Sequence, residues 1–249
     1  MRHSLTYLIL FTALLAVGCD SKQKQFFTER LRYANDSGLT EVEVTIDYPV
    51  NCSEISADSL RYYINQWLGD SYNGDLSDGQ ALVNHYGTAY TSELEELRPA
   101  VETQPYLHYV MVSMECNAPK YISYSVYDET FSGGAHGFHT QQGYTFLKPS
   151  GELFTTPIIN NPDDAAFQQL LRRSINEYFG PYPAEDWLWA SEDELLPLPQ
   201  CPPYLDNQGV TFIYQPYEIA PYAAGMPSFT IPYDSIKPFL TADVKSLID

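Results

Sequence analysis

Hydrophobic residues recur at two different spacings in the first half of the chain. In the segment 40–48 every second residue is apolar, which predicts a strand with one buried face. From residue 60 to residue 68 the apolar positions lie three or four residues apart, which predicts a helix that ends at Gly69. A second helix is predicted from about residue 80 to residue 101, and two strands follow at 106–114 and 121–127. Together these elements predict a β-α-α-β-β unit.

The second half shows similar changes of spacing around a longer irregular segment. A strand is predicted at 141–147, and Asn161-Pro162-Asp163-Asp164 has the composition of a helix start, with a capping residue, an early proline and acids at the positive end of the helix dipole. That helix ends at Gly180. Residues 181–208 contain six prolines and no periodicity, which predicts a long loop. Strands at 210–214 and 229–231 and a short helix at 234–240 follow.

Helices and strands therefore alternate irregularly rather than as βαβ repeats, and this order favours an α+β fold. We predict two small subdomains, residues 33–130 and 131–249, each an antiparallel or mixed sheet with packed helices.

The N-terminus carries a targeting signal. Arg2 and His3 precede an apolar run of about 13 residues, which is too short to span a bilayer and is typical of a secretory signal. The run ends in Ala16-Val17-Gly18-Cys19, which resembles the lipobox of bacterial lipoproteins, where the cysteine is acylated. This interpretation predicts a signal peptide at 1–18, a lipid anchor on Cys19, a tether at 19–32 and a location in the bacterial cell envelope. A plain secretory signal that ends near Gly18 is the alternative.

The net charge of the chain limits the kinds of partner that it can bind. The chain has 32 acidic residues against 13 lysines and arginines, a net charge of −19. Such a protein does not bind nucleic acid, because phosphates demand a positive surface. It attracts cationic partners instead. Beyond Cys19, three cysteines remain, at positions 52, 116 and 201; Cys52 and Cys116 each follow a predicted strand, so we take them as the candidate disulfide.

Three motifs are familiar in combination. They are Gly133-Gly134-Ala135-His136-Gly137, the run from Tyr214 to Gly225 (YQPYEIAPYAAG), and Ile231-Pro232-Tyr233. From about residue 33 to its end the chain resembles an uncharacterised family that forms the extracellular half of lysozyme-sensing anti-sigma factors of the sigma-V type. A similar region precedes the catalytic domain of some peptidoglycan deacetylases. The resemblance implies a domain that binds lysozyme, and we expect this domain alone, without a sigma-binding segment or a deacetylase domain.

The motif residues are interpreted as mainly structural. Adjacent glycines allow a positive φ and a close backbone approach, and His136 is expected to hold the loop; a general base is the alternative. A metal pair with His139 is not favoured because no third ligand is evident, so no metal and no cofactor are predicted. The second motif is expected to be a tightly packed irregular segment, in which a buried Glu218 would need partners. Its other members are Tyr217, Pro221, Tyr222 and Gly225.

The best binding candidates lie in the predicted loop. Trp187 and Trp189 stand beside Glu185 and Asp186, and aromatic anchors flanked by acids suit a cationic protein such as a lysozyme. Packing of both tryptophans against the core is the alternative. We therefore predict a lipid-anchored envelope protein with a ligand-binding module for lysozyme or a peptidoglycan fragment, and no enzymatic activity. The alternatives are an enzyme that modifies cell-wall polymer with His136 as its base, and a purely structural envelope protein.

Overall fold

The protein was analysed as a computed structural model, which describes residues 26–50, 53–100, 102–182 and 184–249. The predicted signal peptide, Cys19, the first part of the tether and Cys52 lie outside the described residues. No helix in the described ranges is long and apolar enough to cross a membrane.

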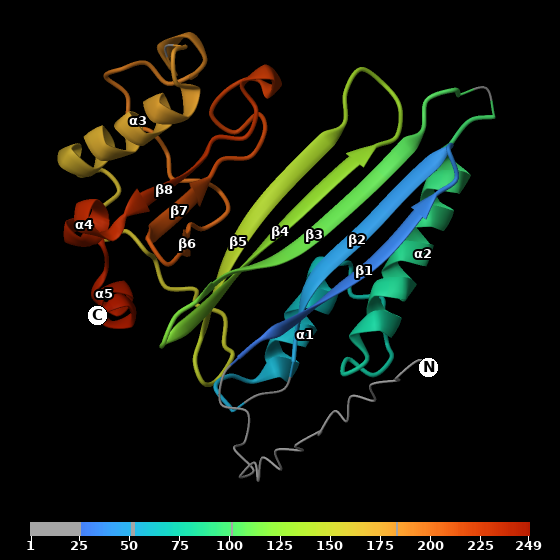
Figure 1. Cartoon of the computed structure of the whole chain (residues 1–249). Helices are drawn as coiled ribbons and strands as arrows, with labels where there is room; N and C mark the ends of the chain where they lie inside the picture. The colour runs from blue at the N-terminus through green and yellow to red at the C-terminus, as the bar shows by residue number, and fades with distance from the viewer. Residues whose placement is uncertain (1–25, 51–52, 101, 183) are drawn as a thin grey trace, which may run out of the picture.

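The larger part of the protein is a mixed sheet of five strands (Figure 1). The strands lie side by side in chain order: β1 (Thr28–Asp36), β2 (Thr40–Pro49), β3 (Tyr106–Asn117), β4 (Tyr121–Phe131) and β5 (Phe138–Leu147). Neighbours are antiparallel except β2 and β3, which run parallel. A parallel pair needs a long crossover connection, which here contains the helices α1 (Ala57–Trp67) and α2 (Gly79–Leu97).

The predicted tether is wrong over its last residues. Residues 28–32 belong to β1, which pairs with β2. Leu31 is buried and lies opposite Ile46, whereas its neighbours Arg30 and Arg32 are exposed. With so few apolar positions, β1 gives only a weak alternating pattern, and its stability comes from the pairing with β2.

Helices α1 and α2 cover one face of the sheet, and the first hydrophobic core lies between them and the strands. The helical stripe predicted from the sequence provides part of this core, with Leu60 and Ile64 fully buried. Both helices have side-chain N-caps: Ser56 accepts from the Ser59 amide and Asp78 from the Ala81 amide.

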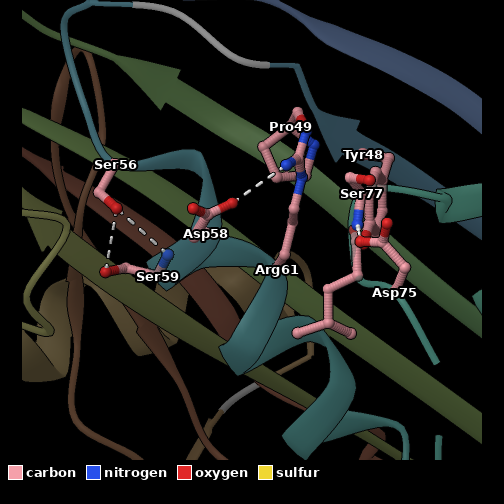
Figure 2. A network of polar contacts seen from close by, with 9 residues as sticks. Tyr48, Pro49, Ser56, Asp58, Ser59, Arg61, Asp75 and Ser77 are labelled. Carbon is pink, nitrogen blue, oxygen red and sulfur yellow. Dashed lines mark hydrogen bonds and ion pairs between the residues drawn. The ribbon is translucent and has the colours of Figure 1, made fainter. Parts of the chain in front are cut away.

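A buried arginine ties α1 to the end of β2 (Figure 2). Nε and Nη2 of Arg61 donate to the Pro49 carbonyl at 3.2 and 3.0 Å, and Nη1 donates to the Asp58 carboxylate at 3.1 Å. The guanidinium also lies 5.7 Å from the centroid of the Tyr48 ring. A buried charge is tolerated only when it is paired, and these contacts provide that pairing.

The second subdomain is a three-stranded antiparallel sheet with helices around it. Its strands are β6 (Tyr204–Leu205), β7 (Gly209–Ile213) and β8 (Ser228–Pro232), and its helices are α3 (Ala165–Phe179), α4 (Tyr233–Ile236) and α5 (Ala242–Ile248). Short 3₁₀ turns lie at η1 (Ala184–Asp186), η2 (Tyr222–Ala224) and η3 (Lys237–Phe239). A separate core contains Phe167, Leu171, Ile175, Phe212 and Tyr214. The α+β class is thus confirmed.

The start of α3 differs from the prediction by three residues. Asp164, rather than Asn161, caps the helix by accepting from the amides of Ala166 and Phe167 at 2.9 and 3.0 Å. Asn161 instead accepts from the Asp163 amide in the preceding turn. Gly180 ends the helix with a φ of +61°, as its sequence position predicts.

The two subdomains pack along β5. The predicted boundary at residue 131 falls inside the β4–β5 hairpin, because β5 is hydrogen-bonded to β4 in the larger sheet. The Tyr204 ring of β6 lies over Gly143 of β5, the one position of that strand without a side chain. Beside it, the Leu205 amide donates to the Thr145 hydroxyl at 3.0 Å. The hairpin motif is therefore attached to the first sheet and faces the second subdomain.

Candidate functional site

The predicted binding loop borders a cleft of about 590 Å³ beside the second half of α3. Its polar and aromatic lining consists of Arg172, Asn176, Tyr182, Glu185, Trp189 and Glu192, among others. The Trp189 side chain is prominent there, because 59% of the residue is exposed. The cleft thus combines an exposed indole with two carboxylates.

Hydrogen bonds to backbone groups fix the loop around the cleft. Nη2 of Arg172 donates to the carbonyl of Ser191 at 2.7 Å and also to that of Glu194. The Ser191 amide donates to the Glu194 carboxylate at 2.9 Å, and this bond holds the pKa of Glu194 below its usual value. The Trp189 amide donates to the Ile219 carbonyl at 3.0 Å, which connects the loop to the YEIAPYAAG motif. Arg172 is occupied by these carbonyls, so it fixes the shape of the cleft.

The two tryptophans have different environments. The ring of Trp187 is stacked on Phe179 at 6.2 Å between centroids and 4° between planes, and it packs against the second core. Trp189 is exposed and Glu185 lines the same cleft, while Asp186 is exposed outside the cleft lining. Within the described part of the chain, neither Glu185, Asp186 nor Glu192 has a hydrogen bond or ion pair, so these carboxylates are available to a ligand.

The motif at residues 133–137 and the motif at residues 214–225, distant in sequence, meet at the tip of the β4–β5 hairpin. Gly133 and Gly134 have φ values of +93° and +96°, as the sequence predicts for this turn. The imidazole of His136 stacks on Tyr222 with centroids 3.9 Å apart, and its Nδ1 lies 2.7 Å from the Gly137 carbonyl. Because a carbonyl only accepts, Nδ1 carries the proton in this contact. The Tyr222 hydroxyl donates to the same carbonyl at 2.7 Å.

Glu218 holds the neighbouring turn together. Its carboxylate accepts from the backbone amides of Gln200 and Gln215 at 2.5 and 2.7 Å. Its own amide donates to the Gln215 carbonyl at 3.0 Å and closes the turn. Further along, Pro221 precedes η2 and Gly225 follows it with a φ of +77°. These contacts are the backbone partners that a carboxylate at this position requires.

His139 lies on the same side of the hairpin tip. Its Nδ1 is 3.5 Å from the Tyr222 hydroxyl, and its ring is stacked with Tyr127 at 6.2 Å. Among the residues that the structure describes, no group of three or more histidine, cysteine, aspartate or glutamate side chains is arranged to hold a metal ion.

Cys116 is a free, buried cysteine in the structure. The bridge to Cys52 stays a prediction, because Cys52 lies outside the described residues. A register shift between Met114 and Cys116 interrupts the pairing with β4, and the thiol donates to Asn207 of the second subdomain at 3.0 Å. Burial raises the pKa of this thiol. Cys201 is also free and half-buried.

Sequence reasoning missed part of the cleft. Arg172, Asn176 and Tyr182 were not singled out, because in the sequence they resemble ordinary polar positions around the end of a helix. The strained backbone of Tyr217, with a φ of +66°, was also missed, although the preceding proline is a turn signal.

These features define an α+β protein of two packed subdomains, with an acidic, aromatic cleft in the second and two sequence motifs joined at their border. Residues 34–139 match the sequence model of the family described as Deacetylase PdaC, and residues 152–234 match that of the family described as Protein of unknown function (DUF3298). The chain therefore contains one region similar to each of these families, which confirms the family resemblance that its motifs indicate.

Two solved structures share the fold. A DUF3298 family member from Bacteroides fragilis NCTC 9343 is similar to this chain with a TM-score of 0.61 and 21% identity, over 90% of this chain and 97% of that one. A DUF3298 family protein from Pseudomonas aeruginosa PAO1 gives a TM-score of 0.57 and 15% identity, over 90% and 98% of the two chains. No curated protein matches the sequence.

Proposed function

We propose that this protein is a lipid-anchored protein of the bacterial envelope whose second subdomain binds a cationic protein of the lysozyme class. The observation that carries the proposal is the cleft beside α3, whose lining includes the exposed Trp189 together with Glu185 and Glu192, two carboxylates without a partner among the described residues. The family relationship supports it, because related extracellular domains in anti-sigma factors bind lysozyme.

The chemistry of the cleft fits such a partner. A large aromatic side chain that is exposed in the free protein gains most from burial in an interface. Carboxylates around it attract a positively charged surface and set its orientation. The overall charge of −19 acts in the same direction at longer range. Trp187 has no such role in the proposal, because its ring is already packed on Phe179.

Binding is tested by titration calorimetry with a c-type lysozyme. At about 0.15 M salt the Debye length is about 8 Å, so diffuse attraction is weakened while desolvated contacts persist. We expect the wild type to bind at that salt concentration and Trp189→Ala to bind roughly thirty-fold more weakly, equivalent to about 2 kcal/mol. Tyr62→Ala is the matched control, because Tyr62 is similarly exposed, at 51%, but lies on α1.

A second pair of variants tests the carboxylates. Glu192→Gln removes one charge from the cleft, and Glu95→Gln removes one from the exposed face of α2. We expect a larger loss of affinity from the first. Binding that disappears at 0.15 M salt, or that responds equally to the cleft variants and their controls, would contradict the proposal.

The anchor is tested separately. The lipobox sequence before Cys19 supports acylation of that cysteine. We expect Cys19→Ala to move the protein out of the membrane fraction and to abolish labelling with a radioactive fatty acid. A variant that stays in the membrane fraction would argue against the lipid anchor.

A further inference from the structure

Tyr217 occupies a backbone conformation that a tyrosine rarely adopts. It is the third residue of the turn from Gln215 to Glu218, after Pro216, and its φ is +66°. A positive φ at that position of a turn favours glycine or asparagine, because a larger side chain crowds its own backbone. The Glu218 carboxylate, which accepts from two backbone amides, keeps the turn closed. The strain is therefore imposed by well-formed surroundings.

The strained conformation of Tyr217 is not offset by strong contacts of its side chain within the protein. Half of Tyr217 is exposed, and its hydroxyl has no hydrogen bond in the ranges that the structure describes. Its ring has a tilted contact with Tyr222, with centroids 5.6 Å apart. Strained residues of this kind are found preferentially at functional sites. An exposed, strained tyrosine without a strong internal contact is therefore a candidate for contact with a ligand.

Tyr217 lies at one end of a continuous set of rings, which we call the tyrosine–histidine surface. Its members are Tyr217, Tyr222, His136, His139 and Tyr127. Tyr222 lies between His136, at 3.9 Å, and His139, at 5.7 Å, and Tyr127 follows His139 at 6.2 Å. Both subdomains contribute to this surface, because Tyr217 and Tyr222 come from the second and the other three from β4, β5 and their hairpin.

The polar groups beside the rings are suited to sugar hydroxyls. The Tyr127 hydroxyl donates to the Glu129 carboxylate at 2.9 Å, which leaves the lone pairs of the phenolic oxygen and one carboxylate oxygen free to accept. The Tyr217 hydroxyl and Nε2 of His136 and of His139 add donors and acceptors at the same border, because Nδ1 of each histidine already faces a protein group. Among the described residues, the carboxylate beside these rings is that of Glu129, which already accepts from Tyr127, whereas Glu185 and Glu192 at the Trp189 cleft have no such partner.

We propose that the tyrosine–histidine surface binds an uncharged glycan, whose C–H faces pack on the rings while its hydroxyls bond to the polar groups. The strained turn that Glu218 keeps closed positions the exposed Tyr217 ring as one wall of this site. The surface is distinct from the Trp189 cleft, so it adds a second ligand to the proposed function. The glycan that we name is a β-1,4-linked chain of N-acetylglucosamine. The choice of this glycan rests on the proposed envelope location, whereas the surface itself is argued from the ring contacts.

The test uses a variant in which stability and binding are expected to change in opposite directions. Tyr217→Gly removes the ring and also relieves the strain, because glycine adopts a positive φ freely. We expect its melting temperature to equal or exceed that of the wild type. In titration calorimetry with the hexamer of N-acetylglucosamine, we expect at least a ten-fold loss of affinity. Tyr217→Ala keeps the strain but lacks the ring, so it should lose affinity as Tyr217→Gly does and melt at a lower temperature than Tyr217→Gly.

The control is Tyr62→Ala, which removes an equally exposed tyrosine from α1 and should leave hexamer binding unchanged. A wild-type protein that does not bind the hexamer would overturn the proposal. So would a Tyr217→Gly variant that binds it normally, or one that melts at a lower temperature, because Tyr217 would then be structural. Lysozyme binding should not change in Tyr217→Gly, so failure at this surface is distinguishable from failure at the Trp189 cleft.

Discussion

The contact between the subdomains predicts that Gly143→Ala destabilises the protein. A Cβ atom added to Gly143 would lie 1.8 Å from Cδ1 of the Tyr204 ring. Carbon atoms in contact are normally about 3.5–4.0 Å apart, so the ring would have to move by roughly 2 Å. Tyr204 is buried, and the Leu205 amide beside it is bonded to Thr145, so the ring has little room to retreat. Overpacking of this kind costs about 1–3 kcal/mol.

The expected loss is measurable by urea unfolding, or as a fall in melting temperature of about 2–4 °C per kcal/mol for a protein of this size. The lower backbone entropy of the unfolded chain acts in the opposite direction. A glycine replaced by alanine in a compatible conformation stabilises the folded protein by about 0.4–1 kcal/mol for this reason. The clash is therefore the destabilising contribution. In a Tyr204→Ala background the same substitution should be neutral or stabilising. A single variant Gly143→Ala as stable as the wild type, with no coupling to Tyr204, would refute the close packing of β6 on β5.

Four further predictions concern a glycine of the hairpin, the two tryptophans of the loop, His136 and the buried Tyr204. Gly134→Val should cost about 1–3 kcal/mol through backbone strain alone, since no atom lies within 4 Å of an added Cβ, and a normal urea midpoint would argue against the positive φ. Trp187→Ala should lower the unfolding free energy by about 2 kcal/mol or more, whereas Trp189→Ala should change it by less than about 0.5 kcal/mol; equal effects would contradict their different packing. His136→Ala should cost about 1 kcal/mol, for one hydrogen bond, and a global loss of folding would show that the hairpin depends on it. Burial raises the pKa of Tyr204 to about 12, above its value of about 10 in the unfolded chain. The contribution of Tyr204 to stability is therefore fully present below about pH 10 and falls as the pH rises towards 12. Urea midpoints at about pH 9 and 11.5 should show this fall in the wild type and a smaller one in Tyr204→Phe.

The regular elements were predictable because their patterns are local. The alternation at 40–48 and the helical stripe at 60–68 record which side chains face the first core, and Gly180 ends α3 through its own backbone conformation. Strand β1 was not predictable in the same way, because its polar sequence becomes a strand only by pairing with β2. The cap of α3 was displaced because three residues near its start, Asn161, Asp163 and Asp164, are all capable of capping.

The site was only partly predictable for a related reason. Glu185 and Trp189 share the predicted loop and do line one cleft, but Trp187 differs from Trp189 through Phe179, which is distant in sequence. Likewise, the glycines of the hairpin motif indicate a tight turn by themselves, whereas the stacking of His136 on Tyr222 depends on how the subdomains meet. The Cys52–Cys116 pairing rests on strand ends alone and stays a prediction, whereas the contact of the Cys116 thiol with Asn207 depends on how the subdomains meet.

The central claim is that the loop around Trp189 is the surface where a cationic protein binds. Amide hydrogen exchange of the anchor-free protein, with and without saturating c-type lysozyme at about 0.15 M salt, tests it directly, because exchange reports which backbone segments a partner covers. The proposal predicts slower exchange across residues 184–192, and in particular at Glu192, while the exposed face of α2 is unchanged. Unaltered exchange in 184–192, with protection elsewhere or nowhere, would contradict it.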